Sequence, residues 1–287
     1  MIDISGAEPL DELTGTDGRV ASESDSDSDS AVAVTAALAG ARAVRARYGR
    51  VTARIDKGAG DFATDADVAA EEAILAVLRA ARPGDAVHGE EGGRRGAADA
   101  GRTWLVDPLC GTLNFAVGSR LVAVNVALRG GAAAVADPFE DEVFHTDGGG
   151  AWVRRAGADT PLAPTADSAL VDVNLDPPFP HAPGFRAVDL LAHPGFVAGF
   201  RPRVVSTTLA VAWVAAGKRA AYVTDGGDLT GSVHFAAGIA LCRAAGCVVT
   251  GIDGAPLGPE GGGEGLVVAA DAATHAKLME LIRSRRG

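Results

Sequence analysis

The sequence lacks the features that mark membrane-spanning, secreted or disulfide-stabilised proteins. None of its apolar runs approaches the roughly 20 residues that a membrane-spanning helix needs. The N-terminus has no basic segment followed by an apolar one, so we expect no secretory signal, no membrane partner and a cytoplasmic location. Cysteine is scarce, and the odd number predicts no disulfide framework: we expect Cys242 and Cys247 in the core, and only Cys110 elsewhere.

The sequence also lacks any excess of basic residues. It has 26 Lys and Arg against 37 Asp and Glu, for a net charge of −11, so we expect no nucleic-acid partner. Residues 1–30 hold nine acids and only one base, Arg19, and account for −8 of this charge. Ser alternates with Asp or Glu from Ser22 to Ser30, a pattern that buries no apolar area. We therefore expect residues 1–30 to be a disordered acidic tail, with a docking segment as the alternative.

The chain beyond the acidic tail begins with two predicted helices. Apolar residues recur at helical spacing over 31–51, and again from a cap at Thr64 or Asp65 to about residue 82. The segment 52–64 between them is predicted to be irregular. Short apolar runs with Gly-rich turns then predict strands over 87–91, 104–106, 121–128, 132–136, 142–146 and 151–154.

The rest of the chain alternates strands with helices. Strands are predicted over 169–174, 203–205, 220–224, 248–250 and 265–269, and helices over 187–193, 208–216, 233–245 and 271–285. The Pro-rich segment 176–181 and the Gly-rich segment 258–265 are predicted loops. We therefore expect one α/β domain over 31–287, with an α+β half (31–160) and an α/β half (161–287).

Four short clusters of acidic and hydroxyl residues fall on predicted loops at the ends of these elements. They are Asp61 to Asp67, preceded by Lys57; Gly89-Glu90-Glu91; Trp104 to Phe115; and Val233 to Gly238. Taken singly, each has a structural interpretation, such as helix caps for Asp65 and Asp67 or a turn at Asp107-Pro108. The four together, in this order and spacing, indicate a site for chemistry.

These clusters carry a resemblance to the inositol monophosphatase family. The cluster from Trp104 to Phe115 resembles the family motif Trp-x-x-Asp-Pro-x-Asp-Gly-Thr-x-Asn-Phe and departs from it only at Cys110. The segment from Lys57 to Asp67 resembles Lys-x-x-x-Asp-x-x-Thr-x-x-Asp, and Gly89-Glu90-Glu91 matches Gly-Glu-Glu. The segment from Val233 to Gly238 resembles Trp-Asp-x-Ala-Ala-Gly.

The resemblance covers about residues 31 to 285 and implies the fold of that family, a layered αβαβα sandwich. It also implies Mg²⁺ as cofactor, since hard carboxylate and carbonyl oxygens are the ligands that Mg²⁺ prefers. By matching position, the first metal would be held by Glu90, Asp107 and the Leu109 carbonyl. A small phosphorylated metabolite as ligand and a homodimer are further expectations from the resemblance.

The resemblance also implies roles in catalysis. Thr112, supported by Asp67, matches the pair that orients and deprotonates the attacking water, and Glu90 completes the expected catalytic set. Backbone N–H groups of Gly111 and Thr112 are expected to hold the phosphate. The acid that contacts the rest of the substrate has two candidates in a longer loop, Asp225 and Asp228.

Two expected carboxylates of a second metal site are replaced, one by Cys110 and the other by His234. Simple loss of an unused site is one interpretation. Another is a softer site, in which the thiolate and imidazole favour Mn²⁺ or Zn²⁺ over Mg²⁺. A third is a Cys–His nucleophile, with the pKa of Cys110 lowered by the start of the next helix.

The leading functional hypothesis is the metal-dependent hydrolysis of a small phosphomonoester of the inositol or sugar phosphate type. The alternative is a diverged family member. Such a protein would bind a phosphorylated ligand without turnover, or would use Cys110 and His234 for different chemistry.

Overall fold

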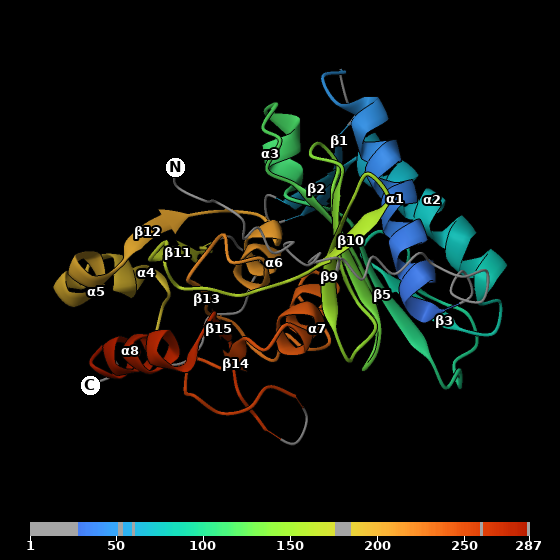
Figure 1. Ribbon diagram of the computed structural model, residues 1–287. Helices are drawn as coiled ribbons and strands as arrows, with labels where there is room; N and C mark the ends of the chain where they lie inside the picture. The colour runs from blue at the N-terminus through green and yellow to red at the C-terminus, as the bar shows by residue number, and fades with distance from the viewer. Residues whose placement is uncertain (1–27, 51–53, 59–60, 176–184, 259–260, 286–287) are drawn as a thin grey trace, which may run out of the picture.

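The computed structural model describes residues 28–50, 54–58, 61–175, 185–258 and 261–285. Most of the acidic tail and the Pro-rich segment 176–181 lie outside these ranges, so the expectations for them stay predictions. In the described residues the chain forms two large sheets, a separate two-stranded sheet and three helical layers (Figure 1).

The first sheet has eight strands and holds the first half of the chain. All neighbouring strands are antiparallel except β3 and β5, which are parallel. The strand order is β10 (Ala158–Pro161), β9 (Ala151–Arg155), β8 (Glu142–Thr146), β7 (Ala133–Asp137), β6 (Ala123–Leu128), β5 (Thr103–Cys110), β3 (Ala86–Gly89) and β4 (Gly93–Arg95).

Two long helices, α1 (Asp29–Arg47) and α2 (Asp65–Ala81), cover one face of this sheet. Their small and apolar residues pack on β5, β6 and β7 as a single buried cluster. The contact is close at Gly40, where an added Cβ would lie 2.8 Å from Ile74 Cδ1 and 2.9 Å from Val124 Cγ1. Both predicted helices are thus confirmed, and Thr64 is the cap of the second.

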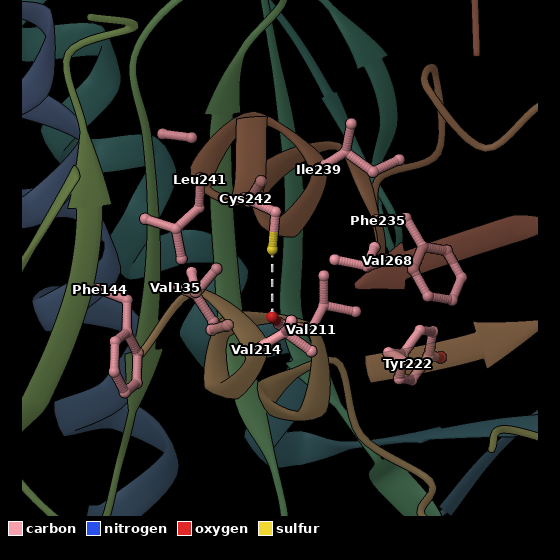
Figure 2. Packing of buried hydrophobic residues seen from close by; sticks show 14 of the residues in the cluster. Val135, Phe144, Val211, Val214, Tyr222, Phe235, Ile239, Leu241, Cys242 and Val268 are labelled. Carbon is pink, nitrogen blue, oxygen red and sulfur yellow. Dashed lines mark hydrogen bonds between the residues drawn. The ribbon is translucent and has the colours of Figure 1, made fainter. Parts of the chain in front are cut away.

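The opposite face of the first sheet packs on α6 (Leu209–Ala215) and α7 (Ala236–Ala244). Figure 2 shows this middle layer, in which Cys242 Sγ donates a hydrogen bond to Val211 O at 3.2 Å. Cys242 and Cys247 are both buried, which confirms their predicted place in the core. The layer also contacts the second sheet, so one cluster of apolar residues joins the two halves.

The second sheet is covered on its outer face by the last helical layer. Its strand order is β12 (Arg201–Val204), β11 (Leu170–Val173), β13 (Ala221–Thr224), β15 (Leu266–Ala269) and β14 (Val248–Thr250). The covering helices are α4 (Val188–Leu191), α5 (Pro194–Gly199) and α8 (Ala272–Arg283). The result is the expected αβαβα sandwich (Figure 1).

Several local predictions were wrong. The supposed break between the first two helices is a hairpin of β1 (Arg54–Gly58) and β2 (Asp61–Thr64), whose first strand is fully exposed and gives no apolar alternation. The supposed loop after Val106 is strand up to Cys110, followed by the short helix α3 (Thr112–Ala116). Helix α7 begins at Ala236 rather than Val233, and β4, β10 and α5 were not predicted.

The boundary of the acidic tail also needs correction. Ser28 is the N-cap of α1, and its side chain accepts a hydrogen bond from Ala31 N. Asp29 accepts hydrogen bonds from Arg82 Nε at 2.9 Å and Arg102 Nη2 at 2.7 Å. Both arginines hold the pKa of Asp29 below its ordinary value, although burial acts against them. Residues 28–30 therefore belong to the folded domain.

This boundary gives a first prediction. Removal of residues 1–27 should leave the melting temperature nearly unchanged, because these residues are acidic and poor in apolar side chains. Removal of residues 1–30 should lower the free energy of unfolding by roughly 1–2 kcal/mol, through loss of the Ser28 cap and the Asp29 ion pairs. The two truncated chains would be compared by urea unfolding, and equal stability would contradict the boundary.

Candidate active site

The candidate site is built around Asp107, a fully buried carboxylate near the end of β5. Its Oδ1 accepts a hydrogen bond from Leu109 N at 3.1 Å. Its Oδ2 lies 2.7 Å from His234 Nδ1 and 3.4 Å from Asn125 Nδ2. Burying a carboxylate costs free energy unless several hydrogen-bond donors or a cation compensate its charge. The three donors around Asp107 provide part of this compensation.

Glu90 lies beside Asp107 because β3 and β5 run parallel, and Glu90 N donates to Val106 O at 3.0 Å. Its Oε1 pairs with Lys57 Nζ at 3.0 Å. Its Oε2 is buried, has no hydrogen-bond partner among the described residues and lies 4.0 Å from His234 Nδ1. Burial, and then the charge of Asp107, raise the pKa of Glu90 to about 8, although Lys57 and His234 act against this. The two carboxyl groups therefore lie close together, and the nearby cationic groups compensate them only in part.

A buried acid on α2, Glu71, fixes the turn that carries Glu90. Its carboxylate accepts hydrogen bonds from Glu91 N at 2.9 Å and Gly92 N at 2.7 Å. An added Cβ at Gly89 would lie 2.5 Å from Glu71 Oε2, so the turn needs glycine there. Sequence reasoning missed Glu71, although an acid on the core-facing side of an amphipathic helix was a usable signal.

The predicted pair of Thr112 and Asp67 meets in the structure. Thr112 Oγ1 lies 2.9 Å from Asp67 Oδ1 and 3.2 Å from Leu109 O. Asp67 Oδ2 accepts hydrogen bonds from Thr64 N at 2.8 Å and Thr64 Oγ1 at 2.6 Å. Asp67 is thus part of the capping box of α2 and also the partner of Thr112. Burial raises its pKa, in spite of these hydrogen bonds.

Gly111 connects β5 to α3 in a left-handed backbone conformation with φ 102°. An added Cβ would lie 2.9 Å from Leu121 O and 3.2 Å from Ser206 O, so only glycine fits without strain. The turn thereby places Thr112 at the start of α3, opposite Asp67.

Cys110 and His234 come together at Asp107. One possible ligand atom from each of the three residues lies within 4.8 Å of the other two. Burial alone would lower the pKa of His234, but Asp107 raises it well above 6.5. The pKa of Cys110 is raised by burial and by Asp107, with hydrogen bonds from His234 and Thr208 acting against this. The lowering of the Cys110 pKa that the nucleophile alternative assumed is therefore wrong, since burial and the charge of Asp107 raise this pKa instead.

Asn125 is a second residue that sequence reasoning missed. It is fully buried on β6, and its Nδ2 donates to Thr208 Oγ1 at 2.8 Å as well as approaching Asp107. Its position was visible as the only polar residue in the run Ala123–Leu128. An amide in a buried strand needs polar partners, and here they are site residues.

The two candidate substrate acids lie in different surroundings. Asp225 follows β13, is nearly buried, and pairs with Arg186 Nε at 3.3 Å and Ala187 N at 3.4 Å. Asp228 accepts hydrogen bonds from Thr230 and lines a cavity of about 640 Å³ beside the β6–β7 turn. That turn is at the opposite end of β6 from the Asp107 pairing, and the cavity contains none of the other candidate residues.

The sequence of this chain is similar to those of known proteins. Residues 25–286 match the model of the inositol monophosphatase family. The inositol-1-monophosphatase of Caulobacter vibrioides is 34% identical over 263 residues, which cover 87% of this chain and 98% of that protein. That of Mesorhizobium japonicum is 35% identical over 236 residues, or 79% and 85% of the two chains. The chain belongs to the inositol monophosphatase family.

Solved structures agree on the fold of this phosphatase family. The extragenic suppressor protein suhB of Bartonella henselae superposes with a TM-score of 0.73 at 26% identity, covering 88% of this chain and 97% of that one. The IMPase of Thermotoga maritima gives a TM-score of 0.73 at 19% identity, with 88% and 95% covered, and shows the fold alone. Within the described residues no helix is long and apolar enough to cross a membrane.

The residues present fit one of the two metals expected for the family. Glu90 Oε2, which has no hydrogen-bond partner among the described residues, and the buried Asp107 offer adjacent hard oxygens, which suits Mg²⁺. The second position offers the sulfur of Cys110 and a nitrogen of His234 beside Asp107. Those donors do not fit Mg²⁺, which takes oxygen ligands.

The raised pKa of Glu90 predicts how the metal-free protein responds to pH. In the folded protein Glu90 keeps its proton up to about pH 8, whereas in the unfolded chain it loses the proton around its ordinary pKa of 4.5. The folded state therefore holds more protons within this window, and the free energy of unfolding should fall as pH rises from 4.5 to about 8. The raised pKa of His234 acts in the same direction above 6.5.

The test is chemical unfolding with a chelator present, across this pH range. Glu90→Gln should flatten the decline, while Glu280→Gln, an exposed position on α8, should keep it. Superimposable pH profiles of Glu90→Gln and the wild type would contradict the assignment.

Proposed function

We propose that this chain is a Mg²⁺-dependent phosphomonoesterase that acts on a small phosphorylated metabolite of the inositol or sugar phosphate type. Glu90, Asp107 and the Leu109 carbonyl would hold the ion. The observation that carries the proposal is Glu90 Oε2, a buried oxygen without a partner beside the buried carboxylate of Asp107. Family membership supports the reaction class.

The chain's own residues supply the remaining chemistry. Bound Mg²⁺ would act as a Lewis acid on the phosphoryl oxygens. Thr112 Oγ1, held by Asp67, directs its lone pairs at the attacking water, and Asp67 takes the proton that passes through the hydroxyl. The raised pKa of Asp67 suits this role, since a stronger base accepts a proton more readily. Glu90 orients the same water from the other side.

Substrate binding is assigned to two parts of the site. Backbone N–H groups of Gly111 and Thr112 hold the phosphate, at a turn that admits only glycine. Asp225 is the better candidate for the hydroxyl groups of the substrate, because Asp228 lines the separate cavity beside the β6–β7 turn.

A diverged family member is the second candidate, and the replaced donors Cys110 and His234 favour it. In this form the protein binds a phosphorylated ligand without turnover. A Cys110 nucleophile is disfavoured by the raised pKa of its thiol, since the thiolate is the reactive species.

The proposal predicts how three site variants behave. Glu90→Gln and Asp107→Asn should weaken Mg²⁺ binding and remove phosphate release together. Thr112→Ala should keep Mg²⁺ binding and slow turnover by about 100-fold or more, because it removes the group that orients the water. The control is Thr35→Ala, which removes an exposed threonine hydroxyl on α1.

The measurements are calorimetric Mg²⁺ titration and a phosphate-release screen over phosphomonoesters, with Mg²⁺, Mn²⁺ and Zn²⁺ each supplied separately. Wild-type phosphate release in all three site variants would reject the mechanism. Ligand binding without phosphate release by the wild-type chain under every metal would favour the diverged form.

A further inference from the structure

We propose that Asp107, Cys110 and His234 form a binding site for a thiophilic divalent transition metal of the Zn²⁺ type, in the place where the family pattern has a second Mg²⁺. The inference rests on the proposed function for one point only, which is that Glu90 and Asp107 hold Mg²⁺ next to this site. The three residues bring one oxygen, one sulfur and one nitrogen donor within 4.8 Å of one another.

An irregularity in β5 brings two of these donors together. Side chains of a regular strand alternate between its faces, so positions three apart, such as 107 and 110, point to opposite sides. The pairing of β5 with β6 shifts register between Asp107 and Cys110, as at a β-bulge. This shift changes the alternation, and both side chains reach the same small volume. The bulge therefore places two candidate metal ligands close together, in addition to its effect on the shape of the sheet.

The third donor comes from the other half of the chain. His234 stands in the turn before α7, and its Nδ1 lies 2.7 Å from Asp107 Oδ2. Ligands at 2.0–2.3 Å from a tetrahedral zinc ion are separated from one another by roughly 3.5 Å. The donors thus need only small side-chain movements to bind an ion, with the Asp107–His234 hydrogen bond exchanged for bonds to the metal.

The donor types select the metal. Thiolate and imidazole favour Zn²⁺ and its neighbours, whereas Mg²⁺ demands oxygen. Three protein ligands with an open fourth position are the pattern of catalytic zinc rather than of closed structural sites. Glu90 Oε2, which has no hydrogen-bond partner among the described residues and lies 4.0 Å from His234 Nδ1, adds an oxygen donor at the same place. Two adjacent ions of different kinds are the result.

The cysteine content makes the proposal directly testable. Cys242 and Cys247 are buried in the apolar middle layer and do not belong to the group of three donors, and Cys110 is the partly exposed cysteine. Co²⁺ is a spectroscopic substitute for Zn²⁺, and a thiolate ligand gives it a charge-transfer band in the near ultraviolet. Such a band in this protein would report on Cys110, and Cys247→Ala is the matched control.

The experiment is a Co²⁺ titration of the full-length chain, followed by absorption. The wild type should bind one Co²⁺ with a thiolate charge-transfer band, which Zn²⁺ removes by displacement and excess Mg²⁺ does not. Cys110→Ala should abolish the band, and His234→Ala should weaken Co²⁺ binding by at least about tenfold. Cys247→Ala should keep both the band and the affinity.

A restoring variant covers the case in which a single substitution disturbs folding. Cys110→Asp combined with His234→Asp supplies oxygen donors, and should lose the band while raising the calorimetric Mg²⁺ stoichiometry from one to two. Absence of the band in the wild type, or its persistence in Cys110→Ala, would overturn the inference.

The outcomes also separate this inference from the proposed function. Mg²⁺-dependent phosphate release without a cobalt–thiolate band leaves the phosphatase proposal standing and removes the transition-metal site. A cobalt–thiolate band without phosphate release under any metal supports the transition-metal site and contradicts the phosphatase proposal.

Discussion

The buried charge of Asp107 is the constraint on which the site depends. A carboxylate with no exposed surface, at the centre of an eight-stranded sheet, is unfavourable unless donors or a cation surround it. The chain supplies a backbone N–H from Leu109, an amide from Asn125 and the imidazole of His234. The nearby Glu90 is a second acid beside the first, and its pKa is raised to about 8. The site therefore favours positively charged groups beside Asp107.

The layered fold explains how residues far apart in sequence reach this carboxylate. Parallel pairing of β3 and β5 places Glu90 beside Asp107, and the first turn of α2 approaches from the helical layer on one face. The turn before α7 reaches the site from the middle layer, which packs between the two sheets. Neither half of the chain therefore holds a complete site. The family fold fixes the place of the chemistry, and individual donors decide which ion binds there.

The sequence predicted those elements whose local pattern of apolar residues and caps agrees with their packing in the fold. Helices α1 and α2 have regular apolar spacing, and Thr64 is a clear cap, so both were found. The β1–β2 hairpin was missed because β1 is exposed throughout and shows no alternation. Pro108 suggested a loop, whereas the structure uses a register shift within β5.

The site residues divide in the same way, into those that carry a local sequence signal and those that depend on distant partners. Several residues carried by a family motif lie together in the structure, and their roles stay predictions. Glu71 and Asn125 were not predicted, because each contacts partners distant in sequence. The pKa of Cys110 was predicted in the wrong direction from its place before a helix. Burial and the charge of Asp107 decide it; Asp107 is a neighbour in the sequence, but the burial of the thiol depends on the tertiary fold.

Asp67 has a consequence of a different kind. One of its oxygens closes the first turn of α2, and the other holds the Thr112 hydroxyl. A fraying helix end would therefore also release the Thr112 hydroxyl, so the order of this helix end and the position of the hydroxyl depend on the same residue. A substitution of Asp67 therefore changes both contacts at once, even where a different cap would serve the helix equally well.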